Sequence, residues 1–75
     1  MENNAFIDIR FIDFLDILDA RATITVFVGD DASIKHIKVY EFLAEPELVR
    51  KYRNYSVVGL KSDLGITTIS IKEEV

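Results

Sequence analysis

Residues 12–19, with the sequence IDFLDILD, constrain the fold more than any other segment of this chain. The segment is too apolar for an ordinary surface helix, and its three aspartates are unfavourable in a helix that is buried all round. We therefore predict a helix from about Arg10 to Asp19 with two contact faces. One face packs on the protein's own sheet, and the other is available to a partner.

The two faces of this helix differ in composition when successive residues are placed about 100° apart. The sheet-facing side carries Phe11, Phe14, Leu15 and Leu18. The opposite side carries Asp8, Asp13, Asp16 and Asp19, with Ile9 and Ile12 among them. This side is either a solvated surface or a protein contact in which the isoleucines are anchors and the aspartates form a polar rim. The sequence leaves both interpretations open.

The length and composition of the chain predict one small domain covering residues 1–75. The chain has no cysteine, so its stability must come from the apolar core. Its hydrophobic fraction of 49% is high for so small a domain, which favours self-association. The net charge of −4 disfavours non-specific binding to nucleic acid or to an anionic membrane.

The first nine residues indicate structure less clearly than the rest of the chain. We interpret residues 1–4 as a frayed terminus, and residues 5–9 fit either a strand or the beginning of the helix. No apolar run is long enough to span a membrane, and the first residues lack the basic region of a signal peptide. Together with the absence of cysteine, these features predict a cytoplasmic protein.

Alternating residues predict a first β-hairpin. In residues 22–28, Ile24, Val26 and Val28 point to one side, as expected for a half-buried strand. Residues 29–33 contain Gly and Asp and predict a turn. Residues 34–40 form the second strand, with Ile37 and Val39 facing the core.

The second half of the chain repeats the order of helix, strand and strand. Pro46 suits the first turn of a helix, and Asn54 is a suitable terminator. Residues 55–61 and 66–72 predict a second hairpin, with Val58 and Leu60 pairing inward with Ile69 and Ile71.

The resulting fold is α+β, in the order helix–strand–strand–helix–strand–strand. The four strands form a mostly antiparallel sheet, and two helices pack on one of its faces. The uncovered face carries Thr23, Thr25, Phe27 and Ser70, with Tyr55 and Val57 beside them. We predict that Phe27, Tyr55 and Val57 form a second contact surface there.

Several segments in this order carry a wider resemblance: FIDFLDILD at 11–19, TITVF at 23–27, YEFLAEPELV at 40–49, YSVV at 55–58 and TISI at 68–71. The pattern resembles short uncharacterised proteins encoded by phages and integrated mobile elements of Gram-positive bacteria. The resemblance covers about residues 10–72, whereas the extension before residue 10 departs from it. It implies a mobile-element origin and brings no catalytic residues.

Catalytic and metal-binding patterns in the sequence are weak. Asp30 and Asp31 follow Gly29 as in some metal motifs, but a hairpin turn explains them better. Ser33, His36 and an aspartate lack the surrounding pattern of a catalytic triad, so we interpret His36 as a surface residue. We predict no enzyme activity and no cofactor.

One basic segment could contact nucleic acid. Arg50, Lys51 and Arg53 alternate with tyrosines, a pattern that binds phosphates and stacks on bases. The same charges also suit the negative C-terminal end of a helix. Because the chain is acidic overall, we expect nucleic-acid binding to be the lesser role.

The leading functional prediction is a small non-catalytic protein–protein interaction module that forms a homodimer. The predicted partner-binding residues are Ile9, Ile12, Asp13, Asp16, Asp19 and Phe27. One alternative is an acidic inhibitor of a host nucleic-acid enzyme, in which the aspartates mimic phosphates. Another is a weak nucleic-acid-binding module that uses Arg50, Lys51 and Arg53.

Overall fold

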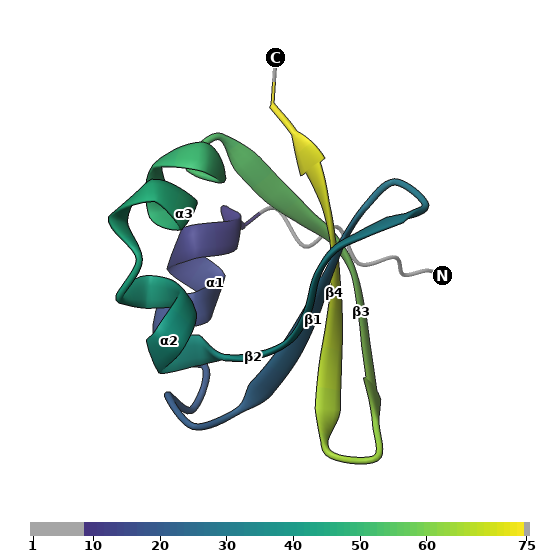
Figure 1. Cartoon of the computed structure of the whole chain (residues 1–75). Coiled ribbons are helices and arrows are strands. Elements are labelled where there is room, and N and C mark those ends of the chain that lie inside the picture. The colour runs from purple at the N-terminus through teal and green to yellow at the C-terminus, as the bar shows by residue number, and fades with distance from the viewer. Residues whose placement is uncertain (1–8, 75) are drawn as a thin grey trace.

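The computed structural model describes residues 9–74, which form a four-stranded sheet and three helices (Figure 1). The elements are α1 (Phe11–Ile17), β1 (Thr23–Val28), β2 (Asp31–Lys38), α2 (Val39–Leu43), α3 (Pro46–Lys51), β3 (Tyr55–Asp63) and β4 (Ile66–Glu73). The predictions made for residues 1–8 lie outside the described residues. The predicted α+β class and the four-stranded sheet are confirmed.

The sheet has the strand order β2-β1-β4-β3 and is mixed. The two hairpins, β1–β2 and β3–β4, are antiparallel, whereas the central strands β1 and β4 pair in parallel. The parallel pair arises because α2 and α3 carry the chain back along the sheet between the hairpins. The description "mostly antiparallel" therefore holds for two of the three strand pairings.

The structure has three helices where the sequence predicted two. Val39 and Tyr40 were assigned to a strand, but they begin α2 instead. Their backbone N–H groups, which have no partner within the first turn of a helix, donate to the carbonyls of Ala22 and Ala20, at 3.0 and 2.9 Å. A Glu41 carboxylate oxygen also accepts from the Lys38 backbone N–H at 3.1 Å, as in a helix cap.

The core lies between the sheet and the helices, which all cover one face of the sheet (Figure 1). At its centre Phe11 of α1 packs edge-on against Phe42 of α2, with ring centroids 5.4 Å apart, and against Tyr52 at 6.0 Å. Tyr52 in turn contacts Tyr55 of β3 at 5.2 Å. Edge-to-face aromatic pairs each stabilise by about 0.5–1.5 kcal/mol beyond their buried area. This aromatic cluster therefore fixes α1 against α2 and α3.

The prediction that Val58 faces inward is wrong because β3 contains a bulge. Val57 pairs with Ile71, but the next pair is Gly59 with Ser70, so Val58 is an extra residue. A bulge reverses the alternation of side chains beyond it. Val57 is consequently buried and Val58 exposed, the opposite of the prediction. Leu60 does pair with Ile69, as predicted, although 44% of its surface is exposed.

The face of the sheet opposite the helices differs from the prediction as well. Tyr55 and Val57 belong to the core or pack against it, so they do not join Phe27 in a second contact surface. Thr25 is buried, and its hydroxyl accepts a hydrogen bond from the His36 backbone N–H at 3.3 Å. This bond occurs where β2 is irregular, since His36 has a φ of 54°. Phe27 is half-buried.

A candidate binding groove between α1 and α3

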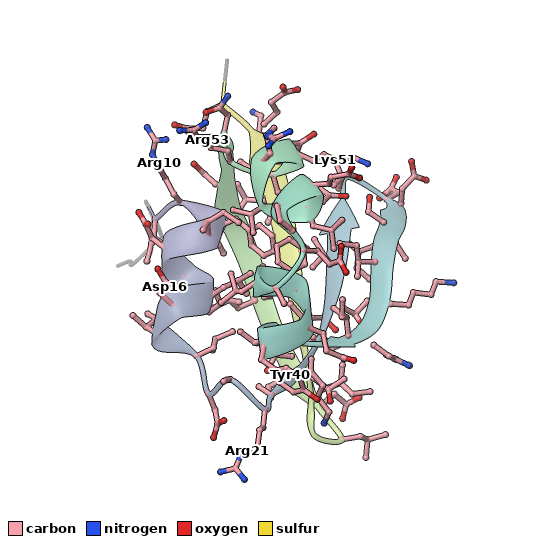
Figure 2. The ribbon with its side chains drawn as sticks, turned by 60° about the vertical axis from the view of Figure 1, so that its left-hand side comes forward. Arg10, Asp16, Arg21, Tyr40, Lys51 and Arg53 are labelled. Atoms are coloured by element: carbon pink, nitrogen blue, oxygen red, sulfur yellow. The ribbon has the colours of Figure 1, made fainter. Side chains whose placement is uncertain are left out.

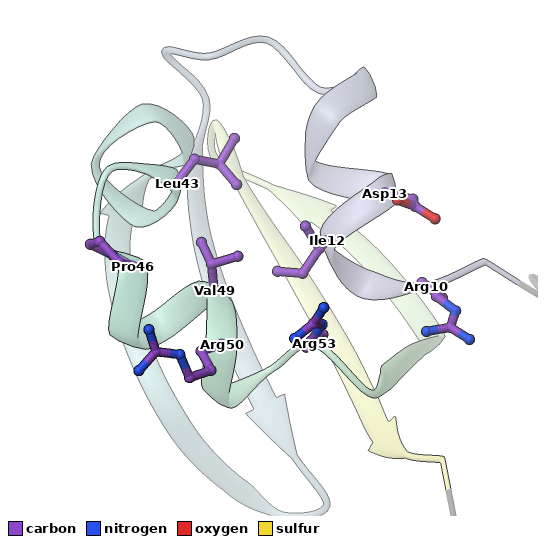
Figure 3. A pocket seen from close by; sticks show the side chains of 8 residues that line it. All are labelled: Arg10, Ile12, Asp13, Leu43, Pro46, Val49, Arg50 and Arg53. Carbon is purple, nitrogen blue, oxygen red and sulfur yellow. The ribbon is translucent and has the colours of Figure 1, made fainter.

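A pocket of about 560 Å³ lies between α1 and the α2–α3 pair (Figure 3). Its volume is within the range of about 300–1,000 Å³ that is usual for ligand sites. It is lined by Arg10, Ile12, Asp13, Leu43, Pro46, Val49, Arg50 and Arg53. We call this pocket the α1–α3 groove.

The apolar part of the groove follows from how the helices are fixed. Phe11 points into the core, so Ile12, the next residue of α1, is turned to the side that faces α3. On the other side Leu43 ends α2, and Val49 lies one turn after Pro46 in α3. Ile12, Leu43 and Val49 are all half-buried and pack against the core. They give the groove an apolar floor.

Three arginines border this floor at one end of the groove. Arg10 precedes α1, and Arg50 and Arg53 lie at and just beyond the end of α3. Figure 3 shows the three guanidinium groups along one end of the groove, with Leu43 at the other end. The lining thus has three positive charges and one negative charge, that of Asp13, which leaves a local excess of two positive charges. The protein as a whole has a net charge of −4.

The position of Arg10 is set by the start of β3. Arg10 forms an antiparallel bridge with Ser56, and the Val57 N–H donates to the Ile9 carbonyl at 3.0 Å. These contacts bring Arg10 to the same end of the molecule as Arg53, as Figure 2 shows. The groove therefore combines residues that lie some forty positions apart in the sequence.

The groove brings together residues from two separate predictions. Ile12 and Asp13 were predicted to bind a protein partner, and Arg50 and Arg53 to contact nucleic acid. The structure places all four in one lining. The sequence did not indicate Arg10, Leu43, Pro46 or Val49 as site residues.

The remaining predicted site residues lie outside the groove lining. Asp16 and Asp19 are exposed, and Ile9 is half-buried at the edge of β3. The Lys51 ammonium lies 5.3 Å from the centre of the Tyr52 ring, and Figure 2 shows it on the other side of α3. Phe27 is on β1, where it pairs with Ser70.

The residues considered for metal binding or catalysis do not converge. Gly29 and Asp30 form a short connection between β1 and β2, and Asp31 already begins β2. His36 is exposed on the edge strand β2, as predicted for a surface residue. Within residues 9–74, no group of three or more His, Cys, Asp or Glu side chains is placed to hold a metal ion.

Comparison of the chain with protein-family models, with curated proteins and with solved structures gave no match. Among the described residues, no helix has the length and apolar character needed to cross a membrane. Function must therefore be inferred from the geometry of the groove and of the sheet.

Proposed function

We propose that this protein is a small non-catalytic binding module whose α1–α3 groove takes a segment of a partner protein that carries both acidic and apolar side chains. One observation carries the proposal: three arginines border an apolar floor in a protein that is otherwise acidic. The floor favours an apolar anchor on the partner, and the arginines favour carboxylates beside that anchor.

The chemistry of the lining assigns different roles to its two parts. A guanidinium group presents planar donors that match a carboxylate, often through two parallel hydrogen bonds. Because Arg10, Arg50 and Arg53 are exposed, ion pairs with them are screened by water and mainly fix orientation and specificity. Most of the affinity must come from burying the partner's apolar side chains against Ile12 and Val49.

Nucleic acid is the second candidate, since arginines also bind phosphates. The groove lining contains no aromatic side chain, however, and stacking of bases on aromatic rings is a main source of affinity for single strands. The net charge of −4 would further repel a polyanion. These features favour an acidic peptide over nucleic acid.

Inhibition of a nucleic-acid enzyme by aspartates that mimic phosphates is less well supported than peptide binding or nucleic-acid binding. Asp16 and Asp19 are exposed, but Asp13 shares its surroundings with three arginines, which weakens the negative field of the helix. We retain origin in a mobile element and a cytoplasmic location as parts of the proposal. The sequence resemblance over residues 10–72 supports the first, and the absence of cysteine supports the second.

Selection from a random displayed-peptide library would test the groove even though the partner is unidentified. We expect the enriched peptides to combine apolar residues with Asp or Glu. A synthetic peptide of this kind should bind about tenfold more weakly to the Arg50→Ala, Arg53→Ala double variant, because two exposed ion pairs are lost. Binding would be measured by calorimetry at low and moderate salt.

The control variant is Arg21→Ala, because Arg21 is exposed and lies at the opposite end of the molecule from Arg10 and Arg53 (Figure 2). It should bind the peptide as the unaltered protein does, and circular dichroism should show that all variants are folded. Enrichment of basic peptides would refute the proposal. Equal affinity of the Arg50→Ala, Arg53→Ala double variant and of the Arg21→Ala control for the peptide would also refute it. Tighter binding of a single-stranded oligonucleotide than of the peptide would favour the second candidate.

A further inference from the structure

The two edges of the sheet are β2 and β3, and they are protected to different degrees. Edge strands expose unpaired backbone groups, which natural proteins usually cover or interrupt. The β2 edge is interrupted at His36, whose φ of 54° breaks the extended conformation, and Lys35 lies beside it. On β3, Ile9 and Arg10 pair with Ser56 and Val57. Within residues 9–74, no strand or bridge covers β3 from Val58 to Asp63.

The turn of the β3–β4 hairpin indicates which backbone groups face outward on this edge. Leu64 and Gly65 have φ values of 52° and 78°, as in the tight turn that joins a directly paired Asp63 and Ile66. Backbone groups alternate in direction along an antiparallel ladder. The N–H and C=O groups of Ser62 and Leu60 therefore point away from β4.

Exposed apolar side chains gather beside these groups. Among the described residues, five large hydrophobic side chains are exposed, and three of them belong to this hairpin. Val58 is 60% exposed, Leu60 44% and Leu64 93%. Apolar residues next to an open strand edge favour pairing with another chain. The β3 edge is consequently the most suitable surface of the described molecule for strand addition.

We propose that the occupant of this edge is the β3 strand of a second copy, paired antiparallel about a two-fold axis at Ser62, so that the two sheets become continuous. The side-chain order of the strand supports this arrangement. A two-fold axis at Ser62 places Lys61 of one copy opposite the partner's Asp63, and the reciprocal pair forms by symmetry. The same axis places Leu60 next to the partner's Leu64.

The other nearby registers are less favourable. An axis at Lys61 would place two lysines directly opposite each other, which destabilises a strand pair. An axis at Leu60 would leave Lys61 opposite Gly59 without a charge partner. Because only a few residues pair, the interface is small, and we expect a dimer that forms as concentration rises.

The absence of cysteine from the chain allows a specific test of this register. Ser62 and Ser33 are both exposed serines, on opposite edges of the sheet. In the proposed dimer, Ser62→Cys brings two thiols across the axis, at a Cα separation of about 5.5 Å that suits a disulfide. Under mild oxidation Ser62→Cys should form a disulfide-linked dimer, whereas Ser33→Cys should form no covalent dimer under the same conditions.

Light scattering across protein concentration would measure the equilibrium without a cross-link. The mass should rise from 8.6 kDa toward twice that value. Leu60→Lys should weaken dimerisation about tenfold or more, because it introduces a charge into the paired strands. Ile17→Lys is the matched control, since Ile17 is exposed at 70% but lies on α1, and it should dimerise normally.

A charge exchange distinguishes the proposed strand pairing from non-specific hydrophobic association. Lys61→Asp should weaken the dimer, and adding Asp63→Lys in the same chain should restore it. A monomer at all concentrations, or dimerisation that is lost with Ile17→Lys but not with Leu60→Lys, would overturn the proposal. Dimerisation that appears only after residues 2–8 are deleted would also overturn it, because the chain's own N-terminal segment would then occupy the edge. The Arg50→Ala, Arg53→Ala variant should dimerise normally, so this test is independent of the groove.

Discussion

The two halves of β3 differ sharply, although they belong to one strand. Val57 is 1% exposed, and Ile9 and Arg10 pair along that part of the edge. Val58, the next residue, is exposed, and the rest of the strand extends to a tip at Leu64 that is almost fully exposed. Burial in this domain is therefore decided by the bulge and by how far the helical layer reaches, and the apolar character of the residue is a poor guide.

The largest test of this comparison removes an aromatic ring from the covered region. Phe42 is fully buried and contacts both Phe11 and Tyr52. Phe42→Ala should lower the free energy of unfolding by about 3–5 kcal/mol, because it deletes apolar contacts and leaves a cavity. Ile17→Ala, at an exposed apolar position, should change it by less than about 0.5 kcal/mol. Urea denaturation measures both values, and similar losses in the two variants would contradict the described core.

A smaller test compares the two adjacent valines directly. Val57→Ala should cost about 2 kcal/mol, since two buried methyl groups are lost. Val58→Ala should change stability by less than about 0.5 kcal/mol. Urea denaturation at a protein concentration that keeps the chain monomeric provides the comparison. If Val58→Ala were the more damaging of the two, the position of the bulge would be wrong.

The smallest expected changes in stability concern Gly59, in the uncovered part of β3, and Gly65, in the turn that follows this strand. Gly65 has a φ of +78°, so Gly65→Ala should destabilise by about 1–2 kcal/mol. At Gly59 an added Cβ would meet the Ser70 Cβ at 3.5 Å, an ordinary contact, and φ is not in the left-handed region. Gly59→Ala should then stabilise by about 0.5 kcal/mol through the unfolded chain. Thermal melting of both variants checks the sign of each change in stability. A clear loss of stability in Gly59→Ala would mean that the bulge requires glycine.

The fold was largely predictable because the clearest hydrophobic periodicities in the sequence correspond to buried faces in the structure. Phe11, Phe14 and Leu15 are buried on one side of α1, and Ile69 and Ile71 are buried in β4, as predicted. The helix α2 was missed because Val39 and Tyr40 have side chains typical of strands. The helix is favoured instead by the Glu41 carboxylate, which accepts from the Lys38 backbone N–H, and by the burial of Phe42 in the core.

The groove was only partly predictable. Ile12 and Asp13 were identified because they interrupt the pattern of a simple amphipathic helix, and Arg50 and Arg53 because they cluster near tyrosines. That these residues share one pocket with Arg10 depends on how β3 pairs with the residues before α1. Such long-range proximity leaves no local signal in a single sequence. The bulge at Val58 is hidden for the same reason, since it is defined by the partner strand.

The parallel pairing of β1 with β4 has a consequence for how the chain reaches its native state. Thr23 pairs with Ile66 and Val28 with Ile71, so the middle of the sheet joins opposite halves of the chain. Closing so large a loop costs entropy before any contact compensates for it, and this slows folding. During synthesis, β1 can form a hairpin with β2 early, but its other side stays unpaired until β4 has left the ribosome. The nascent chain therefore has a period in which its central strand is a vulnerable edge.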